Sequence, residues 1–148
     1  MKKNMKKIMG VVLTLCLTAV MLCGGLAEVQ AASYAKSFTK TVNITGGLLE
    51  LKMDAKKAAT LTVSVSTSSK EKNLTLQAKM WADDMSMPCV NLDSKHKSGK
   101  FQVSVKKGVN TLYIENLTGK NVKVKIKVST KDGKVIKYKS KEIMDDVG

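Results

Sequence analysis

Hydrophobic and polar residues alternate along most of the chain after residue 37, which is the period of a β-strand with one buried face. The clearest run covers residues 122–128, where valine and isoleucine alternate with lysine. Further runs begin near Phe38, Leu49, Leu61, Leu74, Phe101, Leu112 and Ile136. No segment has the caps and 3.6-residue period of a helix. The sequence therefore predicts an all-β domain of about eight strands, folded as a two-sheet β-sandwich or jelly-roll-like domain.

The connection before the last predicted strand has the chemistry of a hairpin. Asp132 and Gly133 are typical of a tight turn between two antiparallel strands. We therefore expect residues 122–128 to pair with the strand that contains Ile136 and Tyr138.

Two segments lack the alternation. Residues 82–99 are predicted to be the longest irregular piece, and residues 141–148 a polar C-terminal tail. The sandwich domain is accordingly assigned to residues 32–140.

The beginning of the chain has the parts of a secretory signal peptide. Positive charge comes first, from Lys2, Lys3, Lys6 and Lys7. The apolar run that follows, residues 8–22, is shorter than the ~20 residues that a membrane-spanning helix needs, which disfavours an uncleaved anchor. Val29 and Ala31 then form a small-residue cleavage pattern, with the cut after Ala31 or, alternatively, after Ala32. Residues 1–31 are therefore interpreted as a removable signal peptide of a bacterial protein that is secreted or associated with the cell envelope.

The cysteines restrict how the mature domain is held together. Cys16 and Cys23 lie in the predicted signal peptide, so the mature domain keeps only Cys89. An internal disulfide is then impossible, and the fold depends on its core, whereas many small secreted domains depend on disulfides. A disulfide between two molecules remains open.

The charge of the chain is strongly positive, at +14, and every basic residue is a lysine. Residues 1–31 contribute their lysines and Glu28, which leaves +11 for the remainder. Lysine is a hydrated point charge without the planar fork with which arginine binds phosphate or carboxylate. Aromatic residues make up only 4% of the chain. This composition favours solubility or attraction to an anionic surface and speaks against specific nucleic-acid recognition.

The best-defined candidate site is a row of lysines. Alternation places Lys123, Lys125 and Lys127 on one face of a strand, about 6.5–7 Å apart. The predicted hairpin adds Lys137 and Lys139 beside them. Two interpretations stay open: the lysines form an anion-binding face, or they solvate an edge strand and prevent sheets from pairing edge to edge.

Two aromatic residues are further candidates. Trp81 follows Leu74, Leu76 and Ala78 on the opposite phase, and Tyr113 also falls on an outward phase. An exposed tryptophan can stack on a sugar or anchor a partner. Alternatively, Trp81 covers the open end of the sandwich.

The segment 82–99 carries the other chemical candidates. Cys89 and His96 would have to meet, with an aspartate to orient the histidine, to act as a thiol nucleophile and its base. Weak oxygen ligands for calcium are Asp83, Asp84, Asn91 and Asp93, although their order matches no calcium-loop pattern. One cysteine and one histidine are too few for a zinc site. We therefore expect no cofactor.

Residues 108–116, Gly-Val-Asn-Thr-Leu-Tyr-Ile-Glu-Asn, followed by residues 122–128, resemble the closing strands of bacterial pre-peptidase C-terminal domains. Residues 38–51, with a glycine pair between two runs, look like the opening strands of those domains. The resemblance covers about residues 34–128, and no protease domain precedes it here. It implies a non-catalytic accessory module.

The sequence thus predicts a non-catalytic secreted binding or accessory module of the bacterial cell envelope or the extracellular space. Its expected partner is an anionic polymer, acidic glycan or cell-surface component, held by the lysine row. Two alternatives remain: a structural or protein-interaction subunit of an exported assembly, and a carbohydrate-binding module that uses Trp81. An enzyme that uses residues 82–99 is the weakest hypothesis, and we expect none.

Overall fold

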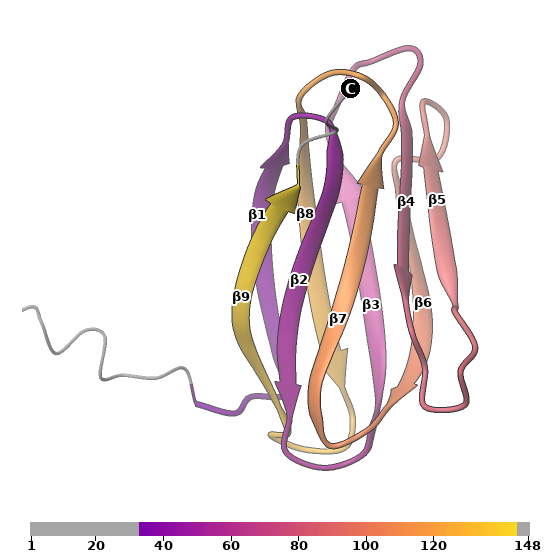
Figure 1. Cartoon of the computed structure of the whole chain (residues 1–148). Helices are drawn as coiled ribbons and strands as arrows, with labels where there is room; N and C mark the ends of the chain where they lie inside the picture. The colour runs from indigo at the N-terminus through magenta and orange to yellow at the C-terminus, as the bar shows by residue number, and fades with distance from the viewer. Residues whose placement is uncertain (1–32, 145–148) are drawn as a thin grey trace, which may run out of the picture. The chain divides into compact units, whose positions relative to one another are not determined.

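The computed structural model describes residues 33–144, and within them antiparallel β-strands account for all the regular structure (Figure 1). The predicted signal peptide and residues 145–148 lie outside the described residues. The strands are β1 (Ser37–Ile44), β2 (Gly47–Ala55), β3 (Ala59–Thr67), β4 (Thr75–Met80), β5 (Cys89–Asp93), β6 (Ser98–Val105), β7 (Gly108–Asn116), β8 (Val122–Thr130) and β9 (Ile136–Met144).

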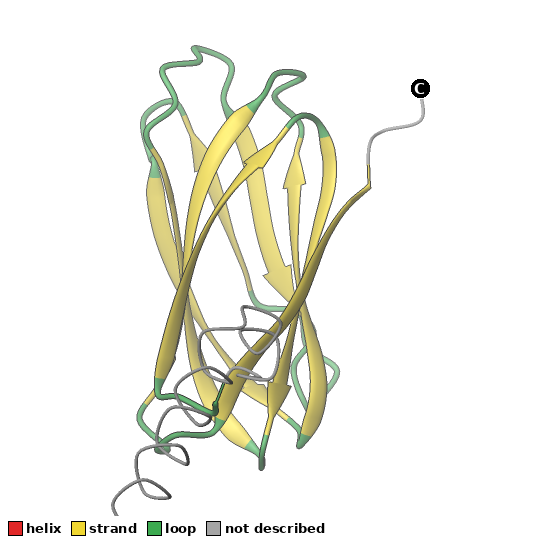
Figure 2. Cartoon of the chain, turned by 90° about the vertical axis from the view of Figure 1, so that its left-hand side faces the viewer, coloured by secondary structure: helices red, strands yellow, loops and turns green. Residues whose placement is uncertain are grey.

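The strands form two sheets that face each other, with the connections gathered at the two ends of the sandwich (Figure 2). One sheet has four strands in the order β1-β8-β3-β6, and the other has five in the order β5-β4-β7-β2-β9. The first eight strands have the order of a jelly roll, and β9 is added at the edge of β2. The predicted all-β, jelly-roll-like sandwich is therefore confirmed.

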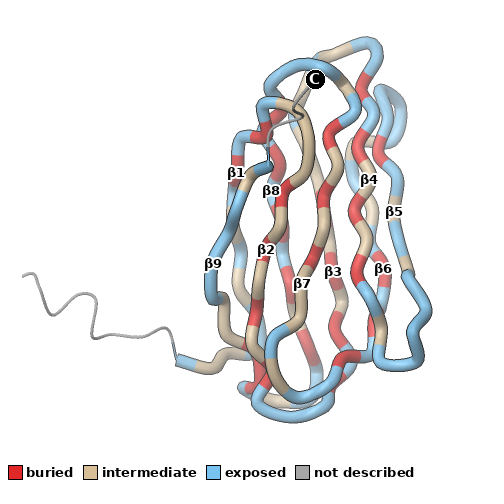
Figure 3. The backbone as a smooth tube through the Cα atoms, viewed as in Figure 1, coloured by how far each residue is buried: buried red, intermediate tan, exposed pale blue. Residues whose placement is uncertain are grey.

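The core lies between the sheets and is built from every second residue of each strand. Buried and exposed positions alternate along the tube in Figure 3, most regularly on β8, where the valines and Ile126 are buried and the lysines exposed. Every buried hydrophobic residue of the described chain falls between Val42 and Ile136. The described residues from Tyr34 onward also form one compact unit by their own contacts, and they contain all of the buried core described above. We therefore expect residues 32–148 to fold on their own.

The segment 82–99 is more regular than predicted. It contains β5 and the beginning of β6, and β5 pairs with β4 from Thr75 opposite Asp93 to Lys79 opposite Cys89. Only Leu92 of β5 is fully buried. Val90 and Leu92 are the two apolar residues that alternate in this polar segment, and two are too few to predict a strand from alternation.

The predicted hairpin between the last two strands is wrong. β8 pairs with β1 and β3 in the four-stranded sheet, whereas β9 pairs with β2 in the five-stranded sheet. The connection crosses from one sheet to the other, and Val135 and Ile136 are both buried where it enters the core. Two successive buried residues break the strand alternation and mark this crossing. The last strand also continues to Met144, so residues 141–144 of the expected tail belong to β9.

Lys40 interrupts the apolar face of β1 for a local reason. β1 and β9 are edge strands of opposite sheets and meet at one side of the sandwich. There the ammonium of Lys40 lies 4.0 Å from the centroid of the Tyr138 ring. The ring of Phe38 packs edge-on against Tyr138 at 5.9 Å. The cation–π contact lets a lysine occupy an inward position at this boundary.

The other side of the sandwich closes where β5 meets β6, and Gly99 makes this approach possible. A Cβ atom on Gly99 would lie 2.3 Å from Cγ2 of Val90. We predict that Gly99→Ala lowers the free energy of unfolding by about 1–3 kcal/mol, because the branched Val90 side chain has little freedom to move away. Urea denaturation measures the change.

The Val90→Ala exchange provides the control, since it removes the clashing methyl group. In the double variant, Gly99→Ala should cost clearly less than it does in the wild-type background. Equal costs in the two backgrounds would contradict this account of Gly99.

Candidate functional site

The outer face of the four-stranded sheet has an unusual composition. The inward residues of its strands form one half of the core, and the outward residues alternate with them. The outward residues are Ser37, Thr39, Thr41 and Asn43 of β1, Thr60, Thr62, Ser64 and Ser66 of β3, Ser98, Lys100, Gln102 and Ser104 of β6, and Lys123, Lys125, Lys127 and Ser129 of β8. We call this set the lysine face. It carries hydroxyl, amide and ammonium groups and neither a carboxylate nor an apolar side chain.

Three exposed lysines lie along the middle of the lysine face. Lys125 is opposite Thr41 of β1 and Ser66 of β3, and Lys127 is opposite Thr39 and Ser64 in the same way. Since β8 has hydrogen-bonded neighbours on both sides, it is not an edge strand. Protection of a sheet edge therefore does not explain these lysines.

Lys137 and Lys139 do not extend this row, contrary to the sequence-based expectation. Both lie on β9, which belongs to the five-stranded sheet. The ammonium of Lys137 is instead 5.1 Å from the centroid of the Tyr34 ring. The residue of this face that sequence reasoning missed is Lys100 of β6, which lies opposite Ser64 of β3. Its outward phase is readable from the buried Phe101 beside it, but its place in the sheet depends on the strand order.

The positive charge of the lysine face has no partner within residues 33–144. The ion pairs there join Lys52 to Glu50, Lys79 to Glu115, His96 to Asp93, Lys106 to Asp83 and Lys120 to Glu71. None of them involves a lysine of the lysine face. Ammonium groups of one sign on one surface sum to a positive potential that attracts anions and raises their local concentration.

Two adjoining grooves run over the lysine face. The larger, of about 460 Å³, is lined by Ser64, Val65, Ser66, Ser98, Gly99, Lys100, Lys125 and Lys127. The smaller, of about 290 Å³, is lined by Thr41, Ser66, Thr67, Ser68, Lys123 and Lys125. Ser66 and Lys125 line both, so the grooves adjoin each other.

The hydroxyl groups in these grooves differ in whether they make hydrogen bonds within the protein. Thr67 donates from Oγ1 to the carbonyl of Lys123, 2.7 Å away. The hydroxyls of Ser64, Ser66 and Ser98 make no hydrogen bond within the described residues, and each can donate to an anion beside the lysines. The arrangement can bind negatively charged oxygen groups without forming an enclosed pocket.

The two aromatic candidates lie on a different surface. Trp81 directly follows β4, is 51% exposed, and is not among the partly buried hydrophobic side chains that pack against the core. Tyr113 lies on the outer face of the five-stranded sheet, opposite Lys79 and Glu50, and is half-buried. Neither residue lies on the lysine face, and among residues 33–144 the one aromatic ring pair is Phe38 with Tyr138.

Cys89 and His96, which were considered as a thiol nucleophile and its base, lie apart. Cys89 begins β5, and His96 lies in the turn that follows the other end of this strand. Four residues of extended chain separate Cys89 from Asp93, which corresponds to about 13 Å. The thiol and the imidazole therefore do not form a nucleophile–base pair.

The aspartates considered for calcium are separated and engaged elsewhere. Asp83 pairs with Lys106 at 3.1 Å, and Asp84 accepts a hydrogen bond from the backbone N–H of Ser86 at 3.0 Å. Residues 33–144 contain no cluster of three or more histidine, cysteine or acidic side chains placed to hold a metal ion. In the same residues no helix has the length and apolarity to cross a membrane.

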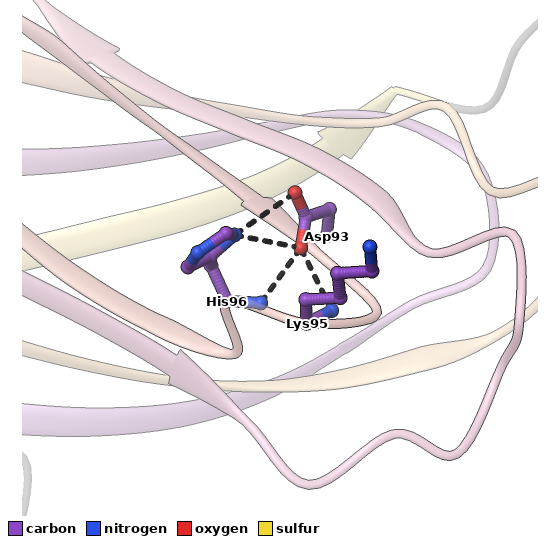
Figure 4. A network of polar contacts seen from close by, with 3 residues as sticks. All are labelled: Asp93, Lys95 and His96. Carbon is purple, nitrogen blue, oxygen red and sulfur yellow. Dashed lines mark hydrogen bonds and ion pairs between the residues drawn. The ribbon is translucent and has the colours of Figure 1, made fainter.

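Asp93 closes the turn between β5 and β6 (Figure 4). Its Oδ1 atom accepts the backbone N–H groups of His96 at 2.6 Å and of Lys95 at 2.8 Å, and Nδ1 of His96 lies 3.1 Å away. These contacts lower the pKa of Asp93 from 3.8 to about 2, mainly through the backbone and then the ring of His96. The carboxylate is a structural group of the turn.

We predict that Asp93 titrates near pH 2 in an NMR titration of the side-chain carboxyl groups. Because the pKa is lowered in the fold, the charged carboxylate stabilises the turn above the ordinary pKa and loses this effect as the pH falls toward 2. His96→Ala removes the ring contact but keeps both backbone donors, so the pKa of Asp93 should rise only part of the way to 3.8. The titration of Asp84 should not change, and an unchanged Asp93 would contradict the role of the ring.

No protein-family model matches the chain, and no curated protein is significantly similar to it. Similar solved structures include CBM35 from Cellvibrio japonicus Abf62, with 12% identity and a TM-score of 0.49 over 66% of this chain and 72% of that one. Another is the pre-peptidase C-terminal domain of collagenase from Bacillus anthracis, with 13% identity and a TM-score of 0.46 over 63% and 89%. A third is Aeromonas hydrophila PliG, a periplasmic lysozyme inhibitor, with 17% identity and a TM-score of 0.45 over 64% and 86%.

A pre-peptidase C-terminal domain is therefore among the solved structures that this chain resembles, as its strand pattern predicts. At these identities the likeness concerns the sandwich fold, and what those proteins bind or inhibit is a property of those proteins.

Proposed function

We propose that the protein is a non-catalytic binding module that holds an anionic polymer through the lysine face, at the cell envelope or outside the cell. The observation that supports this most directly is the face itself. It presents Lys100, Lys123, Lys125 and Lys127 among hydroxyl and amide groups, with no carboxylate to compensate them. The predicted signal peptide agrees with an exported module.

The shape of the site favours a polymer over a small ligand. The two grooves adjoin each other and are open, and their lining residues come from more than one strand of the sheet. An exposed ion pair contributes only about 0.2–1 kcal/mol, so one acidic group would be bound weakly. A chain with regularly repeated acidic groups contacts several lysines at once, and its later contacts form at a high effective concentration.

General solubility is a weaker explanation for the lysine face. A soluble surface is served by charges of both signs, and the five-stranded sheet shows this mixture, with Lys79 next to Glu115 and Lys52 next to Glu50. The four-stranded sheet places only positive charge on its outer side. This asymmetry between the sheets agrees with a ligand-binding role for one of them.

The test uses residues 32–148 and two probes of different acidic chemistry, polygalacturonate and inorganic polyphosphate. Exchange of Lys123, Lys125 and Lys127 for glutamine should weaken binding about threefold to a hundredfold, since each exposed pair contributes about 0.2–1 kcal/mol. Binding of the wild type should also weaken steeply as salt is added, because exposed charges are screened over about 8 Å at physiological ionic strength. Titration calorimetry at several salt concentrations measures both effects.

A matched control is the exchange of Lys137, Lys139 and Lys141 for glutamine, which removes the same charge from β9 of the other sheet. It should retain most of the affinity. Equal losses of affinity in the two triple variants would show that net charge alone attracts the polymer. Binding that does not change with salt would contradict the proposal as well, because attraction between exposed charges is screened by salt.

A further inference from the structure

The connection between β4 and β5 exposes hydrophobic side chains at one end of the sandwich. Trp81 is 51% exposed, Met85 76% and Met87 37%, and all three belong to residues 81–88, which we call the 81–88 loop. Val109, at the beginning of β7, is 55% exposed. Exposed apolar groups that are gathered in one place indicate an interaction site, whereas scattered ones do not.

The other turns at the same end of the sandwich as the 81–88 loop carry lysines. Because successive strands run in opposite directions, the connections β2–β3, β4–β5, β6–β7 and β8–β9 lie at the same end, the lower end in Figure 1. A hydrogen bond from Asp83 N–H to the carbonyl of Ser104 joins two of these connections, at 2.7 Å. Their exposed lysines are Lys56, Lys57, Lys106, Lys107, Lys131 and Lys134.

The 81–88 loop is held in an outward conformation by its own hydrogen bonds. Ala82 N–H donates to the carbonyl of Ser86 at 2.8 Å, and Lys106 pairs with Asp83 at 3.1 Å. Met85 has a φ of 66°, which is unfavourable for a residue with a side chain. The loop therefore keeps Met85 in a strained conformation that points an apolar side chain into solvent, and strain of this kind accompanies functional sites.

The acidic groups of these connections, Asp83, Asp84 and Asp132, are outnumbered by the six lysines, so the charge of these connections stays positive. Asp83 pairs with Lys106, and Asp84 accepts a hydrogen bond from Ser86. Asp132 accepts the backbone N–H of Thr60 at 2.8 Å. Apart from Lys106, the lysines of these connections form no ion pair within residues 33–144, so this surface combines exposed apolar side chains with a net positive charge.

We propose that the 81–88 loop inserts into the interface of an anionic lipid bilayer, a binding site separate from the lysine face. Tryptophan favours the headgroup level of a bilayer, methionine side chains are apolar enough to reach the acyl chains, and the lysines at the same end of the sandwich attract anionic headgroups. The proposal goes beyond polymer binding and does not depend on it.

A sugar ligand is less well matched to this surface. A sugar-binding platform needs polar groups that hydrogen-bond the hydroxyls of the sugar beside the aromatic ring. The exposed polar side chains of the 81–88 loop are already engaged, Asp83 by Lys106 and Asp84 by Ser86. Met85 and Met87 offer only weakly accepting sulfur atoms. Trp81 also has no ring partner among residues 33–144.

Trp81 is the single tryptophan of the chain, so its fluorescence reports directly on the loop. The experiment adds residues 32–148 to vesicles of phosphatidylcholine alone, or with about 30% phosphatidylglycerol as the anionic component in the range that attracts basic segments. The emission should shift to shorter wavelength with the anionic vesicles, and lipids with brominated acyl chains should quench it. Without phosphatidylglycerol both effects should be much weaker.

Variants separate insertion from general attraction. Exchange of Met85 and Met87 for serine should reduce partitioning tenfold or more, because two apolar side chains no longer enter the bilayer. Leu117→Ser is the matched control, since Leu117 is 66% exposed in the β7–β8 connection at the other end, and it should bind like the wild type. All three substituted positions are exposed, so circular dichroism should show an unchanged fold.

Three outcomes would overturn the proposal. The first is no spectral shift with anionic vesicles. The second is equal partitioning of the methionine variant and the Leu117 control. The third is a response of Trp81 to neutral oligosaccharides but not to vesicles, which would assign the loop to a sugar. Glutamine at Lys123, Lys125 and Lys127 should leave the shift in place, so a failure here is distinguishable from a failure of polymer binding.

Discussion

The packing of two sheets against each other is the constraint on which the rest of the molecule depends. No disulfide is available to the described residues, whose single cysteine is exposed, so the apolar side chains between the sheets carry the stability. Each strand must give every second residue to this core. The remaining residues are then forced to the two outer surfaces, where their chemistry is free of packing requirements. The lysine face is a direct product of this division.

Much of the fold follows from the sequence because alternation is a local property. The buried residues of β8, such as Ile126, are recognisable from their neighbours alone. Strand order is not local. The residues near position 130 do not indicate that β8 lies between β1 and β3. Asp132 and Gly133 are typical of a tight turn and therefore predicted a hairpin. The chain instead crosses to the other sheet, and the crossing is marked by two successive buried residues, Val135 and Ile136 at the beginning of β9.

The candidate site was predictable only in its local features. The outward direction of Lys123, Lys125 and Lys127 could be read from the chain, since each follows a buried residue. The residues beside these lysines could not be predicted, because they depend on the order of the strands. Lys100 lies on the same face because β6 belongs to the sheet of β8, whereas Lys137 does not, because β9 belongs to the other sheet. The strained backbone of Met85 also has no signature in the sequence, as it arises from hydrogen bonds that the folded loop completes.

The strict alternation on β8 has a consequence for how such a protein can change over time. A substitution at Lys125 alters the surface and leaves Val124 and Ile126 in place, so its effect on folding is small. Selection can therefore act on ligand preference and on stability through different residues of the same strand. A scaffold with this separation can acquire a new partner by point mutations while its interior stays the same.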